Sequence, residues 1–147
     1  CRCTSYQIQK YSSKVSGPLL DRIDIHLEIP AVSYSELLSD AEGHSSESLR
    51  EKTVRAREIQ RERFHGQKIK VNAHMTSKQL KKYCVLDKQA ESLLHQAMVA
   101  LGISARGHSK ILKVARTIAD LDESDAIKEE HISEAAQYRN LDRGLQK

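Results

Sequence analysis

The chain has 147 residues, a formal net charge of +4 at pH 7, one phenylalanine and no tryptophan. This length suits one ordinary domain, or a small domain with part of another, and the scarcity of aromatics favours an aliphatic core of packed helices. No apolar run approaches the roughly 20 residues that a membrane span needs, so we expect a soluble, cytoplasmic protein without a membrane partner. The charge is compatible with a nucleic-acid partner but does not require one.

The first predicted helix lies within residues 3–15, where Ile8, Tyr11 and Val15 recur at helical spacing. Gly17 and Pro18 end it, because glycine tolerates positive φ and proline suits the first turn of a new helix. A helix of one or two turns is therefore expected from Pro18. Beyond it, polar and apolar residues alternate over residues 24–29, which predicts a short strand with these residues on one face: Ile25, Leu27 and Ile29.

A polar segment at residues 39–46 is the predicted linker, after a short helical turn that contains Tyr34, Leu37 and Leu38. It divides the chain into residues 1–40 and residues 41–147. Residues 47–64 are then predicted to form a helix, because they carry a narrow apolar stripe. The residues of the stripe are Leu49, Thr53, Ala56, Ile59 or Gln60, and Phe64.

This helix is the most basic element of the sequence. Its arginines make a candidate surface for DNA phosphates or for a neighbouring subunit: Arg50, Arg55, Arg57 and Arg61. Acidic residues on the same helix dilute that field, and Glu51 stands four residues before Arg55, at the spacing of a helical ion pair. A solvated helix face without a partner is the alternative interpretation.

Four further helices are predicted by capping residues and apolar spacing, over residues 77 to 83 or 84, 88–101, 105–121 and 129–139. Thr76 and Gln79 fit a capping box, and Asp87 and Ser104 fit N-caps. Gly102 fits a left-handed C-cap.

Cysteine usage bears on metal binding. The odd count of Cys1, Cys3 and Cys84 argues against a disulfide framework. Cys1 and Cys3 could form part of a zinc site, but a closed structural site needs four ligands, and only Cys84 and scattered histidines remain. We therefore predict no complete metal site, and interpret Cys84 as a small core residue.

Arg106 lies in the first turn of the helix that Ser104 caps, where the positive end of the helix dipole disfavours a cation. A local rule broken without local compensation indicates function, and a helix N-terminus with an added guanidinium can bind an anion. An ordinary surface arginine is the alternative. Arg116, the other arginine of this helix, is expected to pair with Asp120.

Two stretches resemble AAA+ ATPases of the magnesium-chelatase-like family, including its competence-protein (ComM-type) branch. Ser16-Gly17-Pro18-Leu19-Leu20-Asp21-Arg22-Ile23-Asp24 resembles the segment after the family's sensor-1 strand. Ser104-Ala105-Arg106, with the following residues 111–121, resembles the family's sensor-2 helix.

The resemblance implies that Arg22 is an arginine finger acting in trans on ATP bound by the neighbouring subunit, and that Arg106 is a sensor-2 arginine acting in cis. A guanidinium suits both roles, because it stabilises the charge on the γ-phosphate through bidentate hydrogen bonds. On the residues alone, a surface ion-pair residue is the favoured interpretation of Arg22.

The family's ATP- and Mg²⁺-binding motifs are missing from this sequence. It has no Gly-x-x-x-x-Gly-Lys-Ser/Thr loop and no strand that ends in an Asp-Glu pair. The chain alone should therefore bind no cofactor and hydrolyse no ATP.

The resemblance implies a mainly α fold, in which a helical lid follows a short helix-strand remnant of an α/β core. The partners would be the rest of that core, the neighbouring subunits of a homo-oligomeric ring, expected to be a hexamer, and DNA. The function would be that of the lid and finger of a DNA helicase or branch-migration motor. The alternatives are a freestanding adaptor that binds DNA or protein through residues 47–64, and a purely structural bundle that needs neither arginine.

Overall fold

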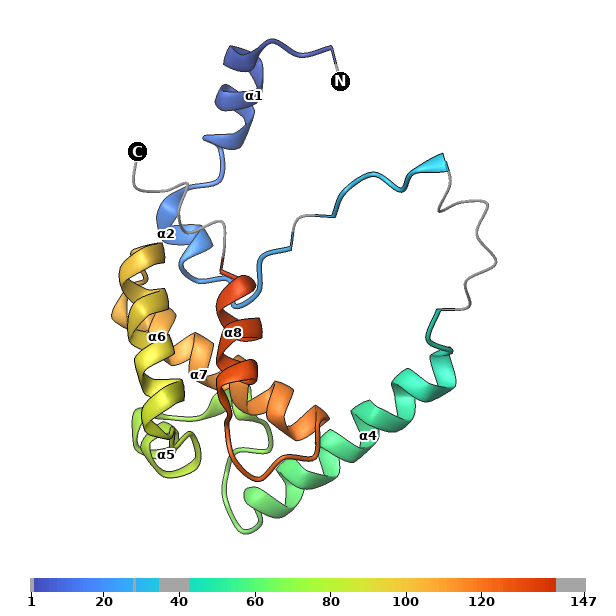
Figure 1. Cartoon of the computed structure of the whole chain (residues 1–147), viewed down its shortest axis with the longest axis vertical. Coiled ribbons are helices and arrows are strands. Elements are labelled where there is room, and N and C mark those ends of the chain that lie inside the picture. The colour runs from blue at the N-terminus through green and yellow to red at the C-terminus, as the bar shows by residue number, and fades with distance from the viewer. Residues whose placement is uncertain (1, 28, 35–42, 140–147) are drawn as a thin grey trace.

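The computed structural model describes residues 2–27, 29–34 and 43–139, which are mainly helical (Figure 1). This confirms the mainly α class. The elements are α1 (Ser5–Ser12), α2 (Gly17–Leu20), α4 (Ser46–Arg63), the 3-10 turn η1 (Asn72–His74), α5 (Ser77–Tyr83), α6 (Lys88–Leu101), α7 (Ala105–Leu121) and α8 (Glu129–Gln137). None of the helices in the described ranges is long and apolar enough to cross a membrane.

The capping residues begin and end the helices where the sequence predicts. The Asp87 carboxylate accepts the Ala90 N–H at 2.8 Å, and the Ser104 hydroxyl accepts the Gly107 N–H at 3.1 Å. Gly102 ends α6 with φ of 62°, in the left-handed region that glycine adopts without strain. These contacts fix the short connection between α6 and α7, and with it the position of the α7 N-terminus.

Helix α7 lies at the centre of the helical body and packs against α4, α5, α8 and η1, while α6 packs against α8. Its fully buried residues include Ile111, Ala115 and Ala119. The one phenylalanine, Phe64, is also fully buried and forms a T-shaped contact with the Tyr83 ring, with 5.5 Å between ring centroids. Each buried large aliphatic or aromatic side chain contributes about 1.5–3 kcal/mol. The aliphatic helical core predicted from composition is thus confirmed.

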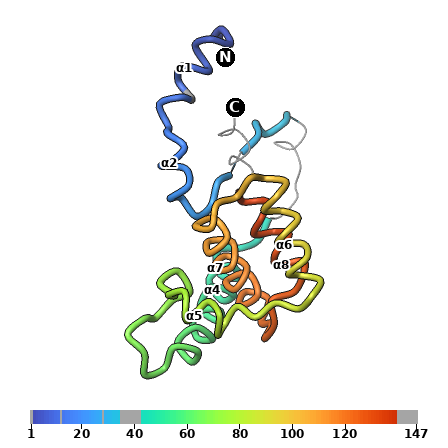
Figure 2. The backbone as a smooth tube through the Cα atoms, turned by 90° about the vertical axis from the view of Figure 1, so that its left-hand side faces the viewer, coloured from blue at the N-terminus to red at the C-terminus, as the bar shows by residue number. Residues whose placement is uncertain are grey.

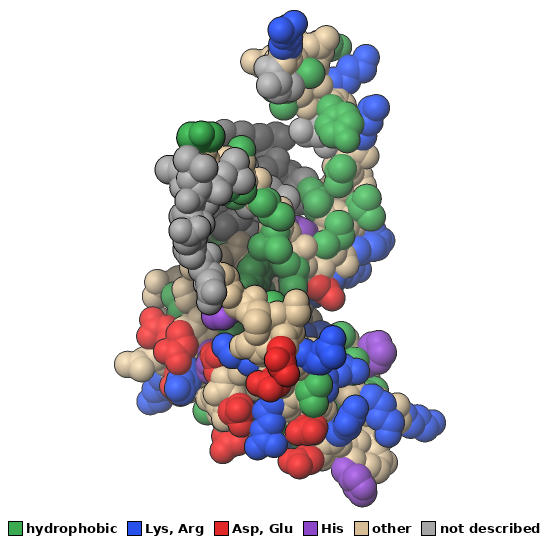
Figure 3. All heavy atoms as spheres, turned by 90° about the vertical axis from the view of Figure 1, so that its right-hand side faces the viewer, with side chains coloured by type: hydrophobic (Ala, Val, Ile, Leu, Met, Phe, Trp, Pro, Cys, Tyr) green, Lys and Arg blue, Asp and Glu red, His purple; other side chains and the backbone are tan. Residues whose placement is uncertain are grey.

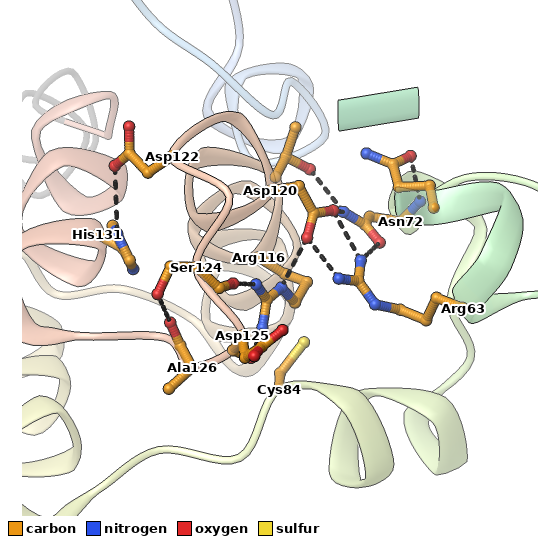
Figure 4. A network of polar contacts seen from close by, with 12 residues as sticks. Arg63, Asn72, Cys84, Arg116, Asp120, Asp122, Ser124, Asp125, Ala126 and His131 are labelled. Carbon is orange, nitrogen blue, oxygen red and sulfur yellow. Dashed lines mark hydrogen bonds and ion pairs between the residues drawn. The ribbon is translucent and has the colours of Figure 1, made fainter. Parts of the chain in front are cut away.

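A buried polar network fixes α4 against α7 (Figure 4). The Asp120 carboxylate accepts two N–H groups from Arg63, at 2.5 and 2.7 Å, and one each from Asn72 at 2.7 Å and Arg116 at 3.1 Å. Arg116 also donates to two carbonyls of the loop after α7, at 2.5 and 2.8 Å. The predicted pairing of Arg116 with Asp120 is confirmed. Burial lowers the pKa of Arg116 from its usual value. Asp120 opposes this shift, because its negative charge stabilises the guanidinium cation.

The strand predicted at residues 24–29 is not present in the described part of that segment, and its burial pattern is inverted. His26 is buried, whereas Ile25 and Leu27 are 46% and 65% exposed. The His26 N–H donates to the Tyr138 carbonyl at 2.7 Å, so the segment docks on the end of α8. A strand needs a neighbouring strand to satisfy its backbone, and none is present among the described residues.

The segment before α4 projects from the helical body at α1 and over residues 29–34 (Figures 1 and 2). Hydrophobic side chains gather on it in the space-filling view (Figure 3). They include Tyr6, Ile8, Tyr11, Leu27, Ile29, Val32 and Tyr34, each more than half exposed. An apolar surface of this extent is typical of an interaction face. The helical turn predicted at Leu37 and Leu38, and residues 39–42 of the predicted linker, lie outside the described residues.

Candidate functional site

Arg22 follows the short helix α2, whose first turn contains Pro18. Its backbone N–H donates to the Leu19 carbonyl at 2.9 Å, which closes the turn. The side chain is exposed, and its Nη1 donates to the Pro18 carbonyl at 2.7 Å. One exposed hydrogen bond of this kind contributes at most about 1 kcal/mol, so the guanidinium can leave it readily for an anionic partner.

Arg106 contacts the residue immediately before Arg22. Its Nη1 lies 2.7 Å from one carboxylate oxygen of Asp21, and the Ser104 hydroxyl donates to the other oxygen at 2.7 Å. The carboxylate therefore lies at the N-terminus of α7, where the helix dipole favours an anion. Hydrogen bonds from Ser104 and then Arg106 hold the pKa of Asp21 below its usual value. Asp21 thus compensates the unfavourable position of Arg106.

Further contacts fasten the same segment to the helical body. Lys110 of α7 donates to the Arg22 carbonyl and to the Asp24 carboxylate. Arg139, which follows α8, is 1% exposed and donates to the Ile23 carbonyl. Its Nη2 also lies 4.0 Å from the Asp21 carboxylate. We call the group of Asp21, Ser104, Arg106 and Arg139 the Asp21 junction.

Chemically, the Asp21 junction is an anion site. The Asp21 carboxylate occupies it: Arg106 contacts the carboxylate at the N-terminus of α7, and Asp21 immediately precedes Arg22, the other predicted site residue. Positive charge gathered in this way can bind phosphate oxygens. Sequence reasoning missed Arg139 and Lys110, because they are 116 and 88 residues from their partners and no local pattern marks either one.

The basic helix is separate from this site. Arg55 does not form the ion pair with Glu51 that their spacing favours. It pairs instead with Glu58 at 3.4 Å and with Glu123 at 3.1 Å. Glu123 follows the C-terminus of α7, whose 17 residues make it about 25 Å long, whereas Arg106 lies at its N-terminus. Arg50, Arg57 and Arg61 are exposed, and acidic and basic side chains are interspersed on the face in Figure 3.

The cysteines form no metal centre in the described part of the chain. Cys3 is exposed and Cys84 is buried in the core, as predicted for Cys84. Burial raises the pKa of the Cys84 thiol to about 11. No group of three or more potential ligands could hold a metal ion among the described residues, and Cys1 lies outside them.

Two family models match the sequence. The model described as "Magnesium chelatase, subunit ChlI C-terminal" matches residues 43–139, and that described as "Magnesium chelatase, subunit ChlI" matches residues 1–37. The first match covers the α4–α8 body, and the second covers the segment that contains Arg22.

Curated relatives match nearly the whole chain. Competence protein ComM of Haemophilus influenzae is 40% identical over 147 residues, which are 99% of this chain and 28% of ComM. The uncharacterized protein YifB of Salmonella typhimurium is 41% identical over 145 residues, 98% of this chain and 28% of YifB. The uncharacterized protein Rv2897c of Mycobacterium tuberculosis is 30% identical over 121 residues, 82% of this chain and 24% of that protein. The chain thus spans less than a third of these relatives, and on its family-model matches it belongs to the magnesium chelatase ChlI family.

Proposed function

We propose that this chain supplies the helical lid and the arginine finger of a ring-forming AAA+ ATPase, with Arg22 acting on ATP bound by the neighbouring subunit. The observation that supports the proposal is the Asp21 junction, in which Arg106 at the N-terminus of α7 is hydrogen-bonded to the residue immediately before Arg22. Phosphoryl transfer spreads charge over the γ-phosphate oxygens, and an arginine finger contributes roughly a thousandfold or more to its rate.

The junction also bears on which ATP Arg106 reaches. In a ring, the ATP that a subunit binds and the ATP that its finger reaches lie at different interfaces of that subunit. Arg106 is hydrogen-bonded to Asp21, the residue next to Arg22 in the same chain. We therefore propose that both arginines serve the neighbour's ATP, in place of the cis role for Arg106 that the resemblance implies.

The exposed apolar side chains of the N-terminal segment fit the same proposal. Tyr6, Leu27 and Ile29 are 70%, 65% and 85% exposed, which is costly for side chains of this size unless something covers them. An α/β core contributed by the rest of the protein would cover them and would hold ATP and Mg²⁺. It would also provide a neighbouring strand for the segment after Arg22, which has none among the described residues.

The substrate that we propose for the motor is DNA, as in the competence-protein branch that the sequence resembles, with helicase or branch-migration activity. The freestanding adaptor acting through α4 has less support. Arg55 is engaged by two glutamates, and Arg63 is buried against Asp120. These contacts leave α4 a mixed surface rather than a basic one.

The deciding experiment measures ATP hydrolysis by mixtures of full-length variants that exchange subunits. Arg22→Ala and a variant with a disabled nucleotide site should each be inactive alone, and mixing should restore turnover at the interfaces that combine an intact site with an intact finger. Normal turnover by Arg22→Ala alone would refute the finger.

Mixing Arg22→Ala with Arg106→Ala then separates the two roles of Arg106. If both arginines serve the neighbour's ATP, every mixed interface lacks one of them, and turnover stays low. If Arg106 acts in cis, an Arg22→Ala subunit that faces an Arg106→Ala subunit has a complete site, and turnover returns. The first mixture is the control for subunit exchange.

A further inference from the structure

The sequence between Glu62 and Asp87 contains no acidic residue. Its lysines are Lys68, Lys70, Lys78, Lys81 and Lys82. Over the whole chain, by contrast, 24 Lys and Arg are nearly balanced by 20 Asp and Glu. Because no carboxylate interrupts it, the positive field of this stretch is undiluted, unlike that of α4.

The fold gathers this charge around a groove of about 880 Å³ between α5 and the connector that precedes η1. Four exposed lysines line it: Lys68, Lys78, Lys81 and Lys82. We call this feature the lysine groove. Figures 1 and 2 place α5 at the opposite end of the helical body from α2, so the groove is remote from the Asp21 junction.

The floor of the lysine groove is held by hydrogen bonds between its own side chains. Gln67 Nε2 donates to the Tyr83 hydroxyl at 2.8 Å, and Gln79 Nε2 donates to Gln67 Oε1 at 2.8 Å. The Tyr83 ring is fixed by its T-shaped contact with Phe64. A pre-organised floor lowers the ordering cost of binding a ligand.

We propose that the lysine groove binds the phosphate backbone of nucleic acid without reading its bases. The Lys82 ammonium lies over the Tyr83 ring, 4.9 Å from its centroid, and so covers a face on which a base would stack. Ile69 is the one aliphatic residue of the lining and is partly buried against the core. A membrane surface or an acidic helix would require larger apolar anchors than that.

This inference rests on the proposed motor, for which it names a surface that holds the nucleic acid. If the four lysines each neutralise one phosphate, they contribute about −3.6 to the slope of log K against log salt concentration on duplex DNA. On a single strand the contribution is about −2.8. Removal of the four charges should reduce the slope by these amounts on the two forms of DNA.

The test compares two full-length variants that lose the same charge. One carries Lys68, Lys78, Lys81 and Lys82 changed to Gln, and the other carries Arg50, Arg55, Arg57 and Arg61 changed to Gln. Fluorescence anisotropy measures the binding of labelled duplex and single-stranded DNA over a salt series, without ATP. We expect the groove variant to lose about three units of slope and the α4 variant to lose less than one.

Equal losses from the two variants, or a larger loss from the α4 variant, would overturn the proposal. So would equal competition by polyglutamate, which would indicate an acidic protein partner. A third variant with the four lysines changed to Arg should keep the slope, and the thermal unfolding of all three shows that they are folded. Because ATP is absent, the slopes do not depend on Arg22 or Arg106, and the subunit-mixing experiment can fail independently.

Discussion

Replacement of Asp21 by Ala should loosen the attachment of the segment that contains Arg22 to the helical body. The carboxylate accepts hydrogen bonds from Ser104 and Arg106, each at 2.7 Å, at the N-terminus of α7. The hydroxyl bond contributes about 1 kcal/mol, and an anion at a helix N-terminus contributes about 0.3–1 kcal/mol. Arg106 is 59% exposed, so solvent screening limits the ion pair to about 0.5 kcal/mol. The sum is about 2 kcal/mol.

Urea unfolding of the protein, its Arg106→Ala and Asp21→Ala variants and the double variant measures this value and its division. The coupling between the two positions should be about 0.5 kcal/mol, and the rest of the Asp21→Ala effect should persist when Arg106 is absent. Coupling of zero would show that Arg106 does not contact Asp21 in solution. An Asp21→Ala effect below about 0.5 kcal/mol would refute the assignment of Asp21 as the attachment point.

The contribution of the Asp21 carboxylate to stability has a distinctive pH dependence. The pKa of Asp21 is lowered in the folded state, so its charged form stabilises the fold above the ordinary aspartate pKa of about 3.9. That contribution is lost as the pH falls through the lower, folded-state pKa. The stability difference between the protein and Asp21→Asn should therefore be constant from pH 5 to pH 7 and shrink below about pH 4. A difference that grows on acidification would contradict the sign.

Two other substitutions test how the site is supported. Asp120→Ala leaves two largely buried arginines without their shared carboxylate, so it should reduce the free energy of unfolding by about 3–5 kcal/mol in urea; a loss under 1 kcal/mol would mean that the network is solvated. Gly107→Ala places a Cβ 2.5 Å from Ile103 Cγ2 at the junction, and this overpacking should cost about 1–3 kcal/mol despite the higher helix propensity of alanine. Gly43→Ala, where no atom lies within 4 Å, is its control, and an equal effect of the two would show that Ile103 moves aside freely.

The sequence predicts the helices well because their signals are local. Asp87, Gly102 and Ser104 each act within one turn of their own position, and the apolar spacing of α6 and α7 directly specifies a buried face. The prediction of a strand at residues 24–29 is wrong for the converse reason. Its alternation specifies a face but not a partner, and among the described residues the fold buries His26 instead of Ile25 and Leu27.

For the same reason, the sequence predicts only some of the residues of the candidate site. Arg106 breaks a local rule and is therefore predictable, whereas its partner Asp21 is 85 residues away and no local pattern connects the two. Arg139 carries no signal at all, because an arginine at the end of a helix is ordinarily exposed. The lysine groove leaves one trace in the sequence, the absence of acidic residues between Glu62 and Asp87, and this trace lacks the helical periodicity that makes the charge of α4 conspicuous.

These attachments determine what the finger can do in the proposed motor. Residues 21–26 are held by Ser104 and Arg106 at the start of α7, by Lys110 one turn later, and by Arg139 and Tyr138 after α8. A segment fastened at both helices moves with them as one body. Any rotation of the lid would therefore carry Arg22 toward or away from the neighbouring subunit's ATP. The orientation of the lid in one subunit would in this way control ATP hydrolysis in the next. Weakening the Asp21 junction should accordingly impair coordination between subunits before it impairs the folding of the lid.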